Sequence, residues 1–365
     1  MKRIRRVGLA MGLATAVSAL PIISTWAESL YPTKQVVDST IASYHPNAGV
    51  TGAIVVAGSD SMQPIMLKAA SAFKLLQPGI KIAVQGGGSE AALDQFLQNQ
   101  ATIRRGDANS KGHHVSGHVG LLSSSRPLTD EERKDFRSRY GSDPVEMPIA
   151  LDAIAIYVNQ DNPVPSLTLE QVDALFGQSR KRGAPTAITT WGQLGLQNGW
   201  DQQPIRLYGH DKRSGTRTMF MHTVLLDGAF RSDVKEEPGP ALEILDIGRD
   251  QLGIGYAGIE FKASTVRVVP IASKSGDTPV SPTVETAADG TYPLTRLLYL
   301  YAKRDSNGQL EPEIAEFLRF INSREGQETF TRAGVYALSS QQIAANIRAL
   351  GGNQVAASDV VAQRR

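Results

Sequence analysis

Apolar strand patterns alternate with amphipathic helical patterns in the first third of the chain, and this order restricts the folds it can adopt. A strand pattern at 53–57 precedes a helical pattern at 64–76. A second strand pattern at 80–84 precedes a helical pattern near 91–97. Because a strand followed by a crossover helix usually leads to a parallel neighbour, the sequence predicts an α/β fold with parallel sheets covered by helices.

Two long apolar strand patterns, at 148–158 and 292–301, bracket the middle third of the chain. Two independent domains in a row would need no such return, so we predict that the chain leaves one domain near residue 150 and re-enters it near residue 293. The first strand carries Asp152. A buried carboxylate must be paired or hydrogen-bonded, so Asp152 either joins a site network or fixes a neighbouring loop, and the sequence leaves both open.

The chain contains four hydroxyl-rich turns, and three of them follow predicted strands. The most informative lies within PIRLYGHDKRSGTRTMF at 204–220, where Ser214, Gly215 and Thr216 open a helix; the others lie at 58–62, 86–89 and 123–127. Free N–H groups and the positive dipole end of a helix attract anions. Ser and Thr also cap helices that bind nothing, so one turn is uninformative. Together the four turns predict one oxyanion held by hydroxyls and amides.

The N-terminus predicts export. A basic start with four Lys or Arg residues precedes an apolar stretch, and Thr25-Trp26-Ala27 supplies small residues at a cleavage site. We read residues 1–27 as a signal peptide rather than a membrane anchor, because the stretch is short and Pro21 interrupts it. Its removal takes away four basic and no acidic residues, which changes the formal net charge from +2 to −2. A near-neutral chain argues against a nucleic-acid partner.

The absence of cysteine excludes both disulfides and an acylated N-terminal cysteine. A periplasmic protein fits these properties. Residues 28–51 lack periodicity and predict a flexible or surface-lying arm, with order beginning near Gly52. Residues 101–118 contain His113, His114 and His118 without a carboxylate at ligand spacing, which favours a surface loop over a metal site. We therefore predict neither a metal nor a cofactor.

The motifs GSDSM, SSSRPL, SGTR, GIGYAG and YPLTRLLYLY occur in this order. The residues and the order of these motifs resemble those of the phosphate-binding proteins of bacterial phosphate ABC importers, over about residues 52–340. The resemblance implies a type II periplasmic binding protein with two α/β lobes, each a mainly parallel sheet flanked by helices, joined by two crossing strands with the ligand in the cleft between them. The implied divisions are 1–27 signal peptide, 28–51 arm, 52–150 and 293–350 lobe 1, 151–292 lobe 2, and 351–365 C-terminal tail.

The resemblance also implies a phosphate site and partners. The protein would be a monomer that delivers phosphate to a membrane ABC permease after its lobes close on the anion, without chemistry. Contacts would come from hydroxyls, backbone amides and one arginine. The implied ligands are Ser61, the amide of Met62, Ser89, Ser125, Arg126, Ser214, Gly215 and Thr216.

Two positions depart from better-known members of that family. Those members place an arginine where this chain has His210, so Arg213 or Arg217 is a candidate substitute, and His210 and Arg217 are further candidate ligands. Some members use an aspartate at the place of Arg126 to accept the proton of hydrogen phosphate; Asp60 or Asp152 would have to replace it here. Sulfate and arsenate therefore remain alternative ligands.

Two other functions account for part of the sequence. A secreted oxyanion-binding protein with a scavenging or sensory role would carry the same turns. An exported phosphatase is the leading enzyme alternative, but the chain lacks a G-x-S-x-G elbow, a P-loop and a dense Asp/His cluster. We therefore predict a binding protein and not an enzyme.

Overall fold

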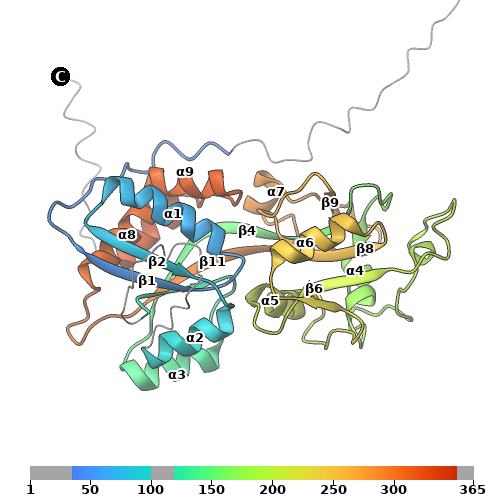
Figure 1. The fold of residues 1–365 in the computed structure, drawn as a ribbon, viewed down its shortest axis with the longest axis horizontal. Helices are drawn as coiled ribbons and strands as arrows, with labels where there is room; N and C mark the ends of the chain where they lie inside the picture. The colour runs from blue at the N-terminus through green and yellow to red at the C-terminus, as the bar shows by residue number, and fades with distance from the viewer. Residues whose placement is uncertain (1–34, 100–118, 352–365) are drawn as a thin grey trace, which may run out of the picture.

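The computed structural model describes residues 35–99 and 119–351 as two α/β bodies connected by two long strands (Figure 1). The predicted signal peptide, the histidine-containing segment and the end of the C-terminal tail lie outside the described residues. Within the described ranges, no helix has the length and apolarity that crossing a bilayer requires.

The first body, which we call lobe 1, is built mainly from the two ends of the described chain. Its own strands form a parallel sheet with β1 in the middle. Its elements are β1 (Gly52–Gly58), α1 (Gln63–Leu76), β2 (Ile80–Gln85), α2 (Ser89–Gln98), β3 (Leu121–Ser124), α3 (Asp130–Tyr140), α8 (Pro312–Ile321), α9 (Arg324–Ala333) and α10 (Ser340–Ala349).

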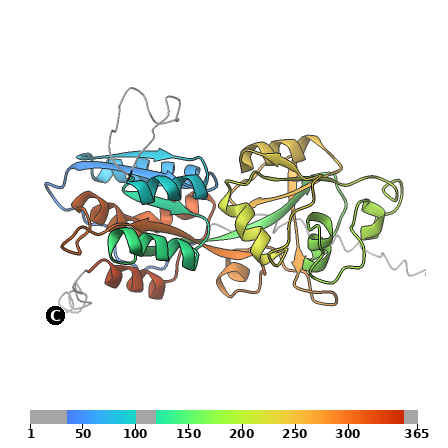
Figure 2. The same ribbon diagram turned by 90° about the horizontal axis from the view of Figure 1, so that it is seen from below.

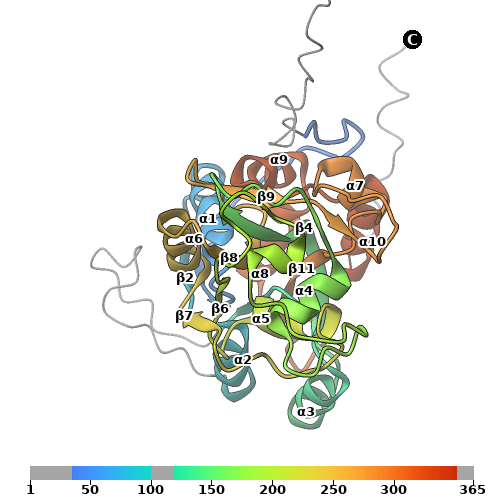
Figure 3. The same cartoon turned by 90° about the vertical axis from the view of Figure 1, so that its right-hand side faces the viewer.

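The second body, lobe 2, comes from the middle of the chain. In Figure 3, α6 lies on one side of β4, β6 and β8, and α4 and α5 lie on the other. Its elements are β5 (Leu167–Thr168), α4 (Leu169–Phe176), the 3₁₀ helix η1 (Trp191–Leu194), β6 (Arg206–His210), α5 (Gly215–Thr223), β7 (Lys235–Glu237), α6 (Pro240–Arg249), β8 (Gly253–Gly258), β9 (Val266–Val269), β10 (Ile271–Ala272) and α7 (Val284–Ala288).

The strands β4 (Val145–Asn159) and β11 (Thr295–Ala302) pair with each other and join the two lobes (Figure 2). The sheet runs in the order β2-β1-β3-β11-β4-β8-β6-β7, and β9 also pairs with β4. Pairing is parallel within each lobe at β2-β1-β3 and β8-β6-β7, and antiparallel where β11 and β4 cross between the lobes. The predicted two-lobed α/β fold is therefore confirmed.

Separate hydrophobic cores fill the lobes. The main core of lobe 1 includes β4 up to Ala150, whereas the core of lobe 2 includes β4 from Ala153 onward. Asp152 lies between them, opposite Arg296 in the register of β4 and β11. The apolar pattern of β4 is thus interrupted by a charged pair where the strand passes from one lobe to the other.

The described part of the arm, residues 35–51, lies on lobe 1, which is the surface-lying alternative of the prediction rather than the flexible one. Ile41 and Tyr44 are buried against lobe 1. The Tyr44 ring packs on Phe73 and Phe320, and its hydroxyl donates to Glu316 Oε1 at 2.5 Å. The segment lacks periodicity because a few anchoring side chains attach it to helices that lie far away in the sequence.

Candidate anion-binding site

The N-terminus of α5 in lobe 2 lies against lobe 1. Ser214 caps this helix, and its Oγ accepts the N–H of Arg217 at 3.3 Å. An ideal Cβ on Gly215 would lie 2.5 Å from Ser89 Oγ and 2.7 Å from Ser125 Oγ. The first N–H groups of a helix lack acceptors within that helix, so Gly215 and Thr216 present amide donors beside two serines of lobe 1.

Hydroxyl groups from three turns of lobe 1 gather around this helix start. Ser61 Oγ lies 2.9 Å from Thr216 Oγ1, and Ser59 Oγ donates to Ser125 Oγ at 3.1 Å. Within the part of the chain that the structure describes, Ser89 Oγ has no hydrogen-bond partner although the residue is buried. Each residue of this hydroxyl cluster is at most 3% exposed; its members are Ser59, Ser61, Ser89, Ser125 and Thr216.

A buried ion pair adjoins the hydroxyl cluster at the strand crossing. Arg296 donates from Nε to Asp152 Oδ2 at 2.8 Å and from Nη1 to Thr216 Oγ1 at 2.8 Å. Asp152 also accepts the N–H of Ala153 at 2.7 Å. Asp152 therefore connects to the cluster through Arg296, which sequence reasoning did not single out.

The predicted anion contact of the Arg126 side chain is not supported. All five of its N–H groups have acceptors, which are Glu90, Glu132 and the Pro127 carbonyl, at 2.6–3.3 Å. Burial alone would lower the pKa of Arg126, but the two carboxylates outweigh it and raise the pKa. Arg126 is thus a structural cation of lobe 1.

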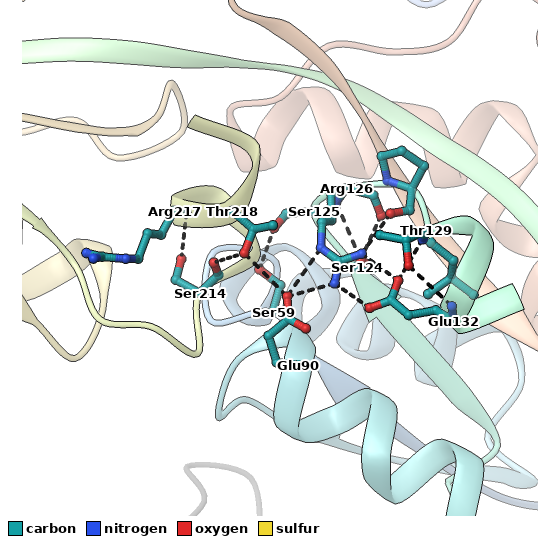
Figure 4. Close-up of polar contacts among 12 residues, drawn as sticks. Ser59, Glu90, Ser124, Ser125, Arg126, Thr129, Glu132, Ser214, Arg217 and Thr218 are labelled. Carbon is teal, nitrogen blue, oxygen red and sulfur yellow. Dashed lines mark hydrogen bonds and ion pairs between the residues drawn. The ribbon is translucent and has the colours of Figure 1, made fainter. Parts of the chain in front are cut away.

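Glu90 extends this arrangement across the lobe boundary. Its Oε1 accepts both from Arg126 and, at 3.4 Å, from Thr218 Oγ1 of α5 (Figure 4). Gly88 also lies so close to the carbonyl of Arg213 that a side chain at residue 88 would collide with it. The lobes therefore meet at several points around the cluster.

Two predicted donors contact their own lobe instead. The Met62 amide donates to the Ser59 carbonyl at 3.1 Å, so it is already paired. Arg217 donates to the His210 carbonyl at 2.8 Å, lies 3.0 Å from Glu236 and stacks 4.2 Å above the Phe230 ring. Its side chain points away from Ser125 and Arg126 in Figure 4.

His210 and Asp60 contact residues of the hydroxyl-rich turns. His210 is 1% exposed, with Nδ1 2.6 Å from Ser214 Oγ and Nε2 3.0 Å from Glu243 Oε2. It therefore supports the residue that caps α5. Asp60 Oδ1 accepts the Gly87 amide at 2.7 Å and so fixes the glycine turn, while burial raises the pKa of Asp60.

Burial also raises the pKa of Glu260, which follows β8, and the negative charge of Asp152 adds to this effect. A protonated Glu260 would leave Arg296 and Asp152 as a neutral pair beside the cluster. The site as a whole thus combines neutral hydroxyls, helix amides and one arginine, a donor set suited to an oxyanion.

Comparisons with known proteins identify the family of this chain. A model of the PBP superfamily domain matches residues 43–325. The phosphate-binding protein PstS of Pseudomonas aeruginosa is 35% identical over 315 residues, covering 86% of this chain and 92% of that protein. This chain belongs to the PBP superfamily and to the PstS family.

One more distant sequence relative and one solved structure are also similar to this chain. Protein SphX of Synechococcus elongatus is 25% identical, covering 86% of this chain and 83% of that protein. A solved structure from Clostridium perfringens, described as a putative phosphate ABC transporter substrate-binding protein with bound phosphate, has a TM-score of 0.62 at 24% identity, covering 79% of this chain and 100% of that one.

Proposed function

We propose that this PstS-family protein captures inorganic phosphate between its lobes and presents it to an ABC importer. The observation that carries the proposal is the buried hydroxyl cluster, in which Ser89 Oγ has no hydrogen-bond partner among the described residues and lies beside the open amides of α5. A tetrahedral oxyanion would accept from hydroxyls and amides of both lobes at once. Bonds to an ionised group contribute about 1.5–3 kcal/mol each, so several can offset dehydration of the anion.

Binding needs no chemical step at the site. The PstS family is one of solute-binding transport components, and the protein is not an enzyme. Because ligand atoms would touch both lobes, the anion stabilises the closed arrangement by its differential contacts. A permease would then recognise the closed form of a monomeric, exported receptor. Export rests on the basic and apolar N-terminal sequence and on the family.

The residues proposed to bind the anion determine which anions the site can accept. The proposed ligands are Ser61, Ser89, Ser125, Ser214, Gly215 and Thr216, joined by Ser59 from the same turn as Ser61. Ser214 contributes mainly by capping α5. Hydroxyls donate or accept, so this set alone admits arsenate and sulfate as well as phosphate.

Calorimetry on protein stripped of bound anion tests the proposal. Phosphate, arsenate and sulfate are titrated in separate runs, with chloride as the control anion. We expect tight one-to-one binding of phosphate and weaker binding of sulfate. Binding of sulfate in preference to phosphate would change the proposed ligand, and absence of binding to all three would end the proposal.

A further inference from the structure

The hydroxyl cluster has one buried cation in direct contact with it among the described arginines that surround it. The N–H groups of Arg126 donate to Glu90, Glu132 and the Pro127 carbonyl. Arg217 donates to the His210 carbonyl and pairs with Glu236, both in lobe 2. The Arg213 side chain is 55% exposed and paired with Asp211. Arg296, by contrast, is 4% exposed and donates directly to Thr216.

The described residues do not accept hydrogen bonds from all the N–H groups of Arg296. Its guanidinium has five N–H groups in a planar fork. Nε donates to Asp152 and one Nη1 hydrogen goes to Thr216. Nη2 forms an ion pair with Asp152 Oδ2 at 2.6 Å but makes no well-formed hydrogen bond to any residue in the ranges 35–99 and 119–351. The edge formed by Nη1 and Nη2 therefore retains donor capacity at the hydroxyl cluster.

The position of Arg296 suits a ligand that both lobes share. The residue lies on β11 directly opposite Asp152 of β4, between the two hydrophobic cores. Asp152 binds the Nε side of the guanidinium, which fixes the plane of the fork. A buried ion pair is costly unless its remaining hydrogen-bonding groups are satisfied. An oxyanion at the cluster would satisfy them with the paired geometry that arginine favours.

We propose that Arg296, oriented by Asp152, is the permanently charged ligand of the bound anion. This inference rests on the proposed function, since it assigns a ligand within that same site. It gives the site a cation although His210 stands where an arginine was expected. It also makes anion capture depend on the strand crossing itself, rather than only on the turns of the two lobes.

The test compares phosphate affinities of stripped wild type, Arg296→Gln and Arg296→Lys by calorimetry. We expect the glutamine variant to bind about 10- to 100-fold more weakly, because a charge-assisted hydrogen bond is lost. The lysine variant retains the positive charge without the planar guanidinium group, so we expect its phosphate affinity to fall between those of the wild type and the glutamine variant. Arg267→Gln is the matched control: Arg267 is a half-buried arginine of β9 that donates to the carbonyls of Asn162 and Val164.

A chemical rescue separates a ligand from a merely structural residue. Arg296→Ala is titrated with phosphate in the presence and absence of millimolar guanidinium. We expect guanidinium to raise the phosphate affinity of this variant at least tenfold. Circular dichroism reports folding; if the glutamine variant is unfolded, the lysine variant decides. Affinity within threefold of wild type in a folded variant overturns the assignment. Lack of phosphate binding by the wild type would instead reject the proposed function.

Discussion

Replacing Gly215 by alanine tests whether the observed contact between the lobes is the ligand-bound arrangement. The added Cβ would lie 2.5 Å from Ser89 Oγ and 2.7 Å from Ser125 Oγ, whereas real Cβ contacts essentially never fall below 3.0 Å. The methyl group must therefore displace Ser89 Oγ by about 0.5 Å or hold the lobes apart. In an open form, with the lobes apart, the same methyl group would no longer meet Ser89 and Ser125.

The size of the effect follows from the bonds at risk. Each hydrogen bond to an ionised group contributes about 1.5–3 kcal/mol, so loss of one weakens phosphate binding about 10- to 100-fold, and loss of both weakens it further. Alanine is the better helix former, by roughly 0.5–1 kcal/mol in a helix interior and less in a first turn. The ligand-free variant should thus be at least as stable as wild type.

The assay is calorimetric phosphate titration together with thermal unfolding of the ligand-free protein. Gly239→Ala is the matched control, because Gly239 also lies at the lobe boundary but its added Cβ would approach only Asp60 Cβ, at 3.9 Å. We expect the control to bind within about twofold of wild type. Wild-type affinity in Gly215→Ala would refute the idea that phosphate binds with the lobes in this arrangement.

Three further predictions concern neighbouring features. Arg126→Gln should lower the free energy of unfolding by about 3 kcal/mol, because it leaves the part-buried carboxylates of Glu90 and Glu132 without their cation. It should change phosphate affinity less than threefold. A tenfold loss of phosphate affinity in calorimetry would show that Arg126 is a ligand. Burial and the charge of Asp152 raise the pKa of Glu260. Because Glu260 then binds its proton more tightly in the folded state than in the unfolded state, the wild type should lose stability relative to Glu260→Gln as pH rises from about 5 to 8. Denaturant midpoints that do not change with pH in either protein would contradict this. Tyr44→Ala should cost about 3 kcal/mol or more of unfolding free energy, and an unchanged denaturation curve would mean that the arm does not support lobe 1.

Local features of the site could be read from the sequence because helix starts are encoded within a few residues. Ser214 and Gly215 specify a capped helix by themselves, and the turns at 86–89 and 123–127 follow their strands directly. The alternation of strand and helix patterns likewise required only local periodicity. These parts of the account depended on neighbours in the chain.

The remaining features depended on contacts between distant residues. Arg126 stands within a serine turn, but Glu90, 36 residues earlier, captures its side chain. Arg296 pairs with Asp152 across 144 residues, because the register of β4 and β11 places them opposite each other. A signal was available: the Asp152 strand needed a partner, and the second long strand pattern, TRLLYLYA in the structure, carries one arginine.

A crystal structure of the phosphate complex would show whether the anion bridges the two lobes at the start of α5. We expect the anion at the lobe boundary, with hydrogen bonds to the hydroxyl cluster, to the first amides of α5 and to the Nη1–Nη2 edge of Arg296. Phosphate bound on one lobe alone, or at a place that touches neither Ser89 nor Thr216, would contradict the account.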